Sequence, residues 1–258
     1  MARIVAVMNQ KGGVGKTTTV VNLSACVAAK SRRVLAIDLD PQANTTSGLG
    51  RQASEGKSVY DVLTGAVPLD AIIIDTSAES LRLAPSDIRL AAAEVELLGV
   101  DKKEHALEKA IKPTVGLFDY IIIDCPPSLG QLTLNALTAA DSVLIPIQCE
   151  YFALEGVGQL MKTIQMVKRN LNPSLEIEGV VLTMLDGRTN LGLQVVQQVK
   201  KHFKSKVYAS AIPRNIRLGE APSHGLPVNI YDPRSAGAAA YQELAKEFIS
   251  RCEGGNPK

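Results

Sequence analysis

The sequence has no tryptophan and only four phenylalanines among its 258 residues. A hydrophobic core must therefore be built from Leu, Ile, Val and Ala. Cysteine is also scarce: the four residues Cys26, Cys125, Cys149 and Cys252 include no C-x-x-C pair. Their spacing suits neither a zinc site nor a disulfide framework. We interpret them as small buried side chains of a protein in a reducing compartment.

Long hydrophobic runs are missing as well. No apolar run approaches the ~20 residues that a membrane-spanning helix needs, and the N-terminal stretch lacks the apolar core and cleavage site of a signal peptide. We therefore expect a cytoplasmic protein that has no membrane partner. Hydrophobic residues make up 46% of the chain and charged residues 21%, which is typical of a globular protein.

Acidic residues are absent between Asp186 and Glu220. Residues 151–258 hold 14 basic and 9 acidic side chains, a net charge of +5, whereas the whole chain carries only +2. Clustered basic side chains are typical of a surface that binds a polyanion such as nucleic acid. Three of the lysines end an expected helix, where they suit the helix dipole whether or not DNA is bound. They are Lys200, Lys201 and Lys204.

Short apolar runs of strand length alternate with longer helical patterns along the chain. The runs are continuous, as expected for strands that are buried on both faces of a sheet. They are Ile4–Met8, Val34–Ile37, Tyr120–Ile123, Val143–Ile147, Val180–Met184 and Val207–Ile212. The helical patterns are Thr17–Lys30, Leu132–Ala140, Leu154–Asn170 and Leu191–Phe203. This alternation predicts an α/β fold with a mostly parallel, twisted sheet and helices on both faces.

Residues 48–118 are less regular and hold one further expected helix, near Ser86–Leu98. Their apolar residues are too scattered for a second core, so we interpret them as an elaboration of the same domain. We therefore expect a single domain over residues 1–258.

A glycine-rich loop lies between the first expected strand and the first expected helix. Glycines let the backbone turn tightly and point N–H groups at an anion, and the start of the helix adds its dipole. Lys16 can reach the β- and γ-phosphates of a nucleotide, and the Thr17 hydroxyl can bind Mg²⁺. The usual pattern G-x-x-x-x-G-K-[ST] would place a glycine at position 10, where the chain has Gln10. The loop is predicted to bind ATP or ADP through Gly12, Gly13, Val14, Gly15, Lys16, Thr17 and Thr18.

Lys11 is a second lysine, five positions before Lys16. One lysine is enough to hold the β- and γ-phosphates, so Lys11 is not needed to bind the nucleotide of its own subunit. It either points outward to neutralise phosphate charge in a neighbouring subunit, as an arginine finger supplied in trans does, or it is an exposed surface lysine.

Asp124 ends the apolar strand Tyr120–Ile123 in the Walker B form, and it is predicted to hold Mg²⁺ through water. Asp75 follows a run of the same texture. We favour Asp124 because paired prolines follow it, which end a strand and stiffen the next loop. Asp75 is interpreted as a turn residue.

Two further acids, Asp38 and Asp40, end the second expected strand. Period-2 alternation puts both on the same side, at the carboxyl edge of the sheet, where open α/β sheets bind ligands. Asp40 is the better candidate to orient the attacking water, so it joins Lys11 and Lys16 as a predicted catalytic residue. Asp38 is grouped with the magnesium site, behind the direct ligands. The alternative is that both acids merely cap the strand end.

The chain shares a specific set of short motifs with one known family. The motifs are Lys11–Thr18, Asp38–Gln42, Leu83–Asp87, Asp124–Pro127, Gln148–Tyr151, Asp186–Asn190, Ile212–Asn215 and Tyr231–Arg234. Together they resemble the ParA/Soj chromosome-partition ATPases, which have a deviant Walker A loop, and the likeness covers essentially the whole chain. The resemblance implies a weak, partner-stimulated ATPase that forms a sandwich homodimer with ATP, in which Lys11 contacts nucleotide across the interface.

The resemblance also implies where other ligands bind. The adenine is expected near Met184, Pro213 and Asn215. The dimer is expected to bind double-stranded DNA without sequence preference through Arg188 and Arg217, and so to associate with the nucleoid. A ParB/Spo0J-type centromere-binding protein is the implied partner in chromosome or plasmid partition. The chain starts at the first strand, so we expect it to lack the N-terminal helix-turn-helix domain of longer plasmid relatives.

Two rival functions use related sites. A MinD-like membrane-cycling ATPase, active in division-site placement, would need a C-terminal amphipathic helix rich in Lys and apolar residues. The last expected helix, Ala238–Ser250, instead contains Glu243 and Glu247. An iron–sulfur ATPase related to nitrogenase reductase would need two suitably placed cysteines per subunit, which the sequence lacks.

Overall fold

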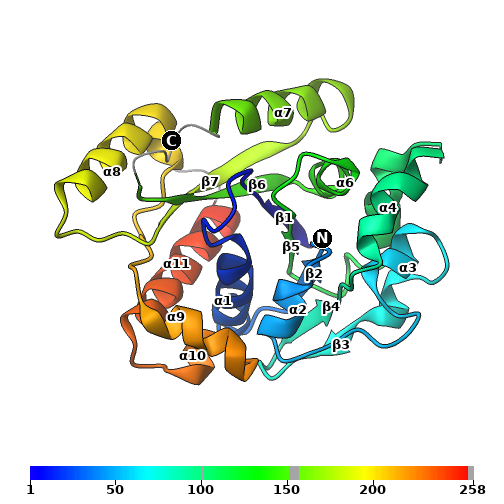
Figure 1. Ribbon diagram of the computed structural model, residues 1–258, viewed down its shortest axis with the longest axis horizontal. Coiled ribbons are helices and arrows are strands. Elements are labelled where there is room, and N and C mark those ends of the chain that lie inside the picture. The colour runs from blue at the N-terminus through cyan, green and yellow to red at the C-terminus, as the bar shows by residue number, and fades with distance from the viewer. Residues whose placement is uncertain (100, 151–156, 255–258) are drawn as a thin grey trace.

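A seven-stranded sheet runs through the middle of the protein and is flanked by helices on both sides (Figure 1). The computed structural model describes residues 1–99, 101–150 and 157–254. The strand order is β3-β4-β2-β5-β1-β6-β7, and every neighbouring pair is parallel except β3 and β4. The strands are β1 (Arg3–Val7), β2 (Val34–Asp38), β3 (Ile74–Asp75), β4 (Leu81–Ala84), β5 (Tyr120–Asp124), β6 (Ser142–Gln148) and β7 (Glu176–Thr183).

The helices divide between two hydrophobic clusters, one on each face of the sheet. Helices α1 (Lys16–Ala28), α10 (Val228–Tyr231) and α11 (Ala236–Glu253) contribute to one cluster. The other contains side chains from α3 (Val59–Leu63), α4 (Leu90–Glu96), α5 (Ala106–Ile111), α6 (Gln131–Ala139), α7 (Val157–Asn170) and α8 (Asn190–Phe203). The short helices α2 (Asn44–Gly48) and α9 (Ile216–Glu220) complete the described set.

Side-chain alternation along the central strands explains the two-sided core. In β5, Ile121 and Ile123 join one cluster, while Tyr120 and Ile122 join the other. All five residues of β5 are buried, and the run before Asp124 is apolar, as is favoured in a strand covered on both faces. The predicted fold class, a mostly parallel sheet with helices on both faces, is confirmed.

Two predictions of local structure were wrong. Residues 207–212 do not form a strand: the segment follows the edge of β7 but makes only an isolated bridge, between Val207 and Val180. Within the irregular region 48–118, two strands were not foreseen. Of these, β4 pairs with β2 along its whole length, and β3 is a two-residue edge strand that ends at the exposed Asp75. The predicted start of α7 at Leu154 lies outside the described residues.

The topology brings the carboxyl ends of β1, β2 and β5 to one edge of the sheet. Asp124 at the end of β5 is in register with Val7 of β1 on one side and with Asp38 of β2 on the other. Helix α1 begins at this edge, nine residues after the last residue of β1. Residues far apart in the sequence therefore meet here.

Candidate nucleotide site

The loop between β1 and α1 has the backbone conformation of a phosphate cradle. Gly13 and Gly15 have φ angles of +75° and +87°, which a residue with a Cβ rarely adopts. A Cβ placed on Gly12 or Gly13 would meet no described atom within 4 Å, so the space above the loop is open. Gly15 is the N-cap of α1, and the first residue of the helix is Lys16. The helix N-terminus therefore points its free N–H groups into this space.

Neighbouring strands brace the loop from below. Thr183, at the end of β7, donates its hydroxyl to the carbonyl oxygen of Val14 over 2.8 Å. Asn9 donates its side-chain amide to the carbonyl oxygen of Pro146 over 2.7 Å and accepts from the Lys11 amide over 3.1 Å. Lys16 is 8% exposed, so its ammonium group acts in a site that is largely shielded from water.

Asp124 and Asp38 are fully buried at the sheet edge, and hydroxyl groups bind both. One Asp124 oxygen, Oδ2, accepts hydrogen bonds from the hydroxyls of Thr17 and Thr45 at 2.8 and 2.7 Å. Asp38 Oδ2 accepts from the amide and hydroxyl of Thr46, at 2.8 and 2.7 Å. Helix α2 therefore holds both acids through two consecutive threonines.

Burial raises the pKa of Asp38, and the charge of Asp124 raises it further, while hydrogen bonds from Thr46 oppose the rise. Burial likewise raises the pKa of Asp124, against the hydrogen bonds from Thr45 and Thr17. Two carboxyl groups in register on adjacent strands thus resist carrying two negative charges without a cation.

The donor set fits Mg²⁺. Asp124 Oδ1 is buried and has no hydrogen-bond partner among the described residues, and such an oxygen is costly unless water or an ion satisfies it. No cluster of three or more His, Cys, Asp or Glu side chains that could hold a metal occurs in the described part of the chain. The Asp124 carboxylate and the Thr17 hydroxyl are hard oxygen donors, and such a set suits a cation that keeps most of its waters, as Mg²⁺ does.

Asp40 lies just beyond β2 and is 7% exposed. Its amide donates to Asp38 Oδ1 over 3.2 Å, and its carboxylate accepts from the Gln42 amide over 3.0 Å. The Ser86 hydroxyl donates to the carbonyl oxygen of Asp40 over 2.8 Å. The Asp40 backbone is thus fixed from two strand ends, and its carboxylate keeps an oxygen for a further ligand such as water.

A pocket of about 240 Å³ opens beside the phosphate loop. It contains all three residues predicted to surround adenine, Met184, Pro213 and Asn215, together with Gly15 and Thr18. Its other lining residues are Thr183, Ile212, Arg214, Leu218, Gly219 and Tyr241. A mostly apolar pocket next to a phosphate cradle suits a purine base, although the role of each residue stays a prediction.

Lys11 lies at the mouth of the loop, at the side of Glu150. Its ammonium nitrogen is 3.9 Å from Glu150 Oε2, and both side chains are substantially exposed. Arg214 also contacts Glu150, at 3.3 Å. The Lys11 ammonium therefore lies beside Glu150, at a partly exposed position.

The two arginines predicted to bind DNA are exposed and paired with acids of the same chain. Arg188 contacts both carboxylate oxygens of Asp186, at 2.9 and 2.8 Å, and 90% of its side chain is exposed. Arg217 contacts Glu220 at 2.7 Å and Asp232 at 3.1 Å. The acids that border the acid-free stretch thus partly neutralise the arginines nearest to its ends.

Sequence reasoning missed four residues of this site: Thr45, Thr46, Ser86 and Thr183. The threonine pair follows Asp38 and Asp40 by a few residues, so its proximity to the strand end was the one usable signal. Ser86 lies in the motif Leu83–Asp87, but the motif alone gave it no role, because its contact with Asp40 depends on the pairing of β4 with β2. Thr183 likewise reaches Val14 only through the position of β7 in the sheet.

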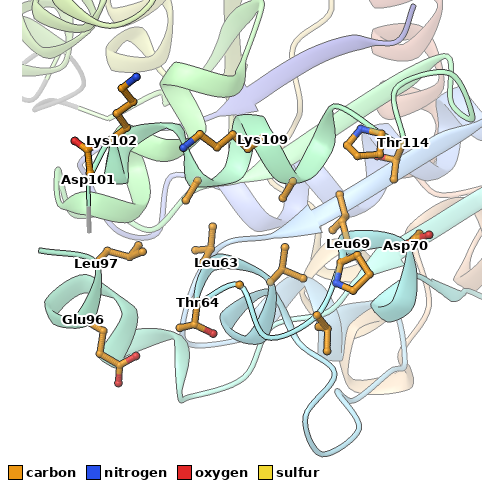
Figure 2. A pocket seen from close by; sticks show the side chains of 17 residues that line it. Leu63, Thr64, Leu69, Asp70, Glu96, Leu97, Asp101, Lys102, Lys109 and Thr114 are labelled. Atoms are coloured by element: carbon orange, nitrogen blue, oxygen red, sulfur yellow. The ribbon is translucent and has the colours of Figure 1, made fainter. Parts of the chain in front are cut away.

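A larger hollow of about 630 Å³ lies away from the phosphate loop. In Figure 2, Lys102 and Lys109 line one side of it, and Leu63, Thr64 and Leu69 line the other. It contains none of the residues predicted to bind ATP, Mg²⁺ or DNA. Size alone therefore does not identify the nucleotide site. Among the described residues, no helix is both long and apolar enough to cross a membrane.

Comparison with known proteins places this geometry in context. Residues 2–177 match a family model described as an AAA domain. The chain is 57% identical over 251 residues to the sporulation initiation inhibitor protein Soj of Bacillus subtilis, covering 97% of this chain and 99% of the relative. It is 49% identical over 252 residues to the chromosome partitioning protein ParA of Myxococcus xanthus, covering 97% and 89%.

Solved structures share the fold. A Mycobacterium smegmatis protein named cobyrinic acid a,c-diamide synthase, with bound ADP and magnesium, superposes with a TM-score of 0.87 at 41% identity, covering 99% of this chain and 97% of that one. The septum site-determining protein MinD of Pyrococcus horikoshii, complexed with Mg-ADP, gives a TM-score of 0.80 at 27% identity and 98% coverage of both chains.

Proposed function

The chain belongs to the ParA/Soj family of chromosome-partitioning P-loop ATPases, and we propose that it forms an ATP-dependent dimer that binds DNA without sequence preference. We propose further that a partner protein stimulates its ATP hydrolysis. The observation that carries the ATPase part is the meeting of the phosphate loop, Asp40 and Asp124 at one sheet edge. The relatives' names support the role in partition.

Each residue of the candidate site has a proposed role in ATP binding or hydrolysis. Lys16 and the N-terminus of α1 bind the β- and γ-phosphates, and Thr17 and Asp124 orient Mg²⁺, with Asp38 behind them. When bound, Mg²⁺ would neutralise charge on those phosphates. Asp40 orients the water that attacks the γ-phosphate. Thr45 and Thr46 hold Asp124 and Asp38 in place.

Lys11 is proposed to contribute charge to the partner subunit's nucleotide. Because its ammonium lies at the exposed mouth of the loop, a second copy facing this edge would bring it toward the opposite phosphates. Hydrolysis removes that charge attraction, so the dimer would separate after turnover.

DNA binding is proposed for the basic surface of residues 187–219, with Arg188 and Arg217 as its main contacts. Exposed Lys and Arg side chains bind phosphates without reading bases, which gives salt-sensitive association with any sequence. This would place the ATP dimer on the nucleoid, where a ParB/Spo0J-type protein could stimulate hydrolysis.

The packing of α11 argues against the membrane-cycling alternative. One side of this helix packs into the core through Tyr241, Leu244, Ala245 and Phe248, and Glu247 binds backbone amides of another segment. A helix so engaged cannot lie in a lipid interface without leaving the fold.

The amide-forming activity implied by the Mycobacterium smegmatis name would require ammonia, which is commonly released from glutamine by the attack of a reactive thiolate. Burial raises the pKa of Cys26 to about 12 and that of Cys149 to about 11. It also raises the pKa of Cys125 and Cys252. Such thiols are poor nucleophiles near neutral pH, so partition remains the function that this chain favours.

The test is to measure mass and DNA binding together, with ADP, with ATP and with a slowly hydrolysed ATP analogue. We expect a monomer without DNA binding in ADP and a dimer bound to DNA in the analogue. Liposome co-sedimentation under the same conditions is the matched control. ATP-dependent liposome binding without DNA binding would instead support the membrane-cycling function.

A further inference from the structure

The segment Val207–Ile212, which follows α8, runs along the edge of β7 but contains two residues more than regular pairing with β7 would need. The Tyr208 amide donates to the Val180 carbonyl oxygen over 2.9 Å, and the Ile212 amide donates to that of Leu182 over 2.8 Å. In regular parallel pairing, residues two apart on one strand bond residues two apart on the other. The segment therefore bulges between Tyr208 and Ile212, and Ser210 takes no place in the ladder.

Glu247 of α11 binds the amides that the bulge leaves free. Its carboxylate accepts hydrogen bonds from the Ala209 amide at 2.9 Å and from the Ser210 amide and hydroxyl at 3.0 and 2.9 Å. Partial burial opposes ionisation of Glu247, but these hydrogen bonds hold its pKa below the usual range. An ionised carboxylate thus replaces the missing strand neighbour.

Arg251, one turn further along α11, fixes the start of the bulge. It donates to Glu247 Oε1 over 2.7 Å and to the Val207 carbonyl oxygen over 3.0 Å. Its guanidinium carbon lies 3.9 Å from the centre of the Tyr208 ring. The ion pair therefore holds the bulge at its first residue as well as at its centre.

The bulge leads directly into the base pocket. After Ile212, residues Pro213 and Asn215 line that pocket, and α11 supplies Tyr241 to the same wall. The Leu185 amide donates to the Ile212 carbonyl oxygen over 3.0 Å, so the chain just beyond β7 fixes the segment on the pocket side. How far the chain reaches along the pocket then depends on the two extra residues between the two anchors.

We infer that Glu247, supported by Arg251, is a positioning residue for the base half of the nucleotide site. It touches no nucleotide. It fixes the bulge that sets where Pro213 and Asn215 stand. The inference rests on the proposed nucleotide pocket, and it predicts that Glu247 affects recognition of the base and ribose without affecting recognition of the phosphates.

The experiment compares binding of Mg-ATP with binding of magnesium tripolyphosphate, which offers only the phosphate groups, by titration calorimetry. Glu247→Ala should weaken ATP binding by roughly 10-fold or more, because it removes several hydrogen bonds to a charged group. Tripolyphosphate binding should stay within about twofold of wild type, since the phosphate loop is untouched. Glu247→Gln keeps one acceptor oxygen and should recover part of the ATP affinity.

Glu243→Ala is the matched control, because Glu243 lies on the same helix and, among the described residues, pairs only with the exposed Lys246, at 2.6 Å. It should bind both ligands as wild type does. Unchanged ATP affinity in Glu247→Ala, or an equal loss for both ligands, would overturn the positioning role. If wild type itself showed no preference for ATP over tripolyphosphate, the proposed base pocket would fail, and this inference with it.

Discussion

The Thr17 hydroxyl donates a hydrogen bond to Asp124 Oδ2 over 2.8 Å, although 107 residues separate the two in the sequence. The first turn of α1 and the end of β5 are thereby locked together at the point where nucleotide phosphates are proposed to bind. The second oxygen of Asp124 is buried without a partner in the described part of the chain. One oxygen of Asp124 thus fixes the first turn of α1, and the other is available to the Mg²⁺ ion that Asp124 is predicted to hold.

Lys16→Ala should abolish measurable ATP binding. The side chain is 8% exposed, and water cannot replace a fixed ammonium group in so closed a loop. Removing one partner of a shielded charge pair costs roughly 2–5 kcal/mol, or about 30-fold and more in affinity. Calorimetry with Mg-ATP measures this, with Lys30→Ala, at an exposed position two residues beyond the end of the same helix, as the control. Equal affinity in the two variants would contradict the site assignment.

The convergence of the candidate site residues at one sheet edge could be predicted largely from the sequence, because most of them lie in a glycine loop and at strand ends, where local order fixes the geometry. Asp38 and Asp124 could be placed together as soon as both strands were expected in one parallel sheet. Thr45 could not, since its bond to Asp124 depends on how α2 packs over the sheet edge.

The segment Val207–Ile212 is a case in which sequence reasoning predicted the wrong local structure. It has the composition of a buried strand, but a carboxylate from α11 binds its amides in place of the neighbouring strand. The composition of a segment indicates its burial and side-chain type. It cannot reveal that Glu247, 37 or 38 residues later, accepts the amide hydrogen bonds that a neighbouring strand would otherwise accept.

Lys11→Ala should leave nucleotide binding by the monomer largely intact and prevent the ATP-dependent dimer. In the monomer Lys11 lies beside Glu150 at 3.9 Å, and such exposed ion pairs contribute little to stability. Light scattering in ATP and in ADP measures the mass, with Lys57→Ala as a surface control. Normal dimerisation of Lys11→Ala in ATP would show that the lysine makes no contact between subunits.

Arg188→Glu and Arg217→Glu should each weaken DNA binding equally on unrelated sequences, and wild-type affinity should fall steeply with salt. Fluorescence anisotropy on two sequences, at two salt concentrations, measures both effects. A shallow salt dependence, or a loss confined to one sequence, would argue against phosphate binding.

Asp186→Asn tests the same surface in the opposite direction. Hydrogen bonds from Arg188 lower the pKa of Asp186 to about 2, so this acid is ionised in any ordinary assay and competes with DNA for the arginine. The amide keeps an oxygen for the Arg188 N–H but removes the charge. DNA affinity should therefore increase and its salt dependence steepen. Weaker binding would mean that Asp186 orients Arg188 for DNA.

The pH dependence of stability should reveal the buried pair Asp38 and Asp124 in the absence of Mg²⁺ and nucleotide. Their pKa values are raised in the folded state, so folding is favoured by protonation. This contribution is complete below the unfolded value of about 4 and is lost as the pH rises through the folded values. Acids with lowered pKa, such as Asp61 and Asp119, act in the opposite sense at more acidic pH.

We therefore expect the thermal midpoint of the ligand-free protein to fall from about pH 5 to about pH 8. Asp38→Asn should remove much of this fall, because the amide cannot ionise and no longer repels Asp124. Calorimetric scans at constant ionic strength measure the midpoint, and Asp70→Asn, at an exposed position, is the control. The same slope in both variants would contradict a raised pKa at Asp38.

Asp40→Ala should bind ATP and dimerise but hydrolyse ATP very slowly. Binding needs charge neutralisation by Lys16 and Mg²⁺, and dimerisation also needs Lys11, whereas phosphoryl transfer needs a positioned water as well. Losing the group that orients this water should lower the rate by about 10²–10⁴. Removing a carboxylate near the γ-phosphate also relieves repulsion between like charges, so ATP binding could tighten.

The same variant tests whether hydrolysis drives release from DNA. If it does, Asp40→Ala persists as an ATP dimer and stays on DNA longer than wild type, so turnover and DNA residence time are measured on one preparation. Ser86→Ala is a useful companion, because it removes only the hydrogen bond to the Asp40 carbonyl oxygen and should slow turnover less. Near-normal turnover in Asp40→Ala would move the role to Asp38 or to a backbone group. Slow turnover with ordinary residence time would instead separate hydrolysis from release, since the dimer would then leave DNA with its ATP intact.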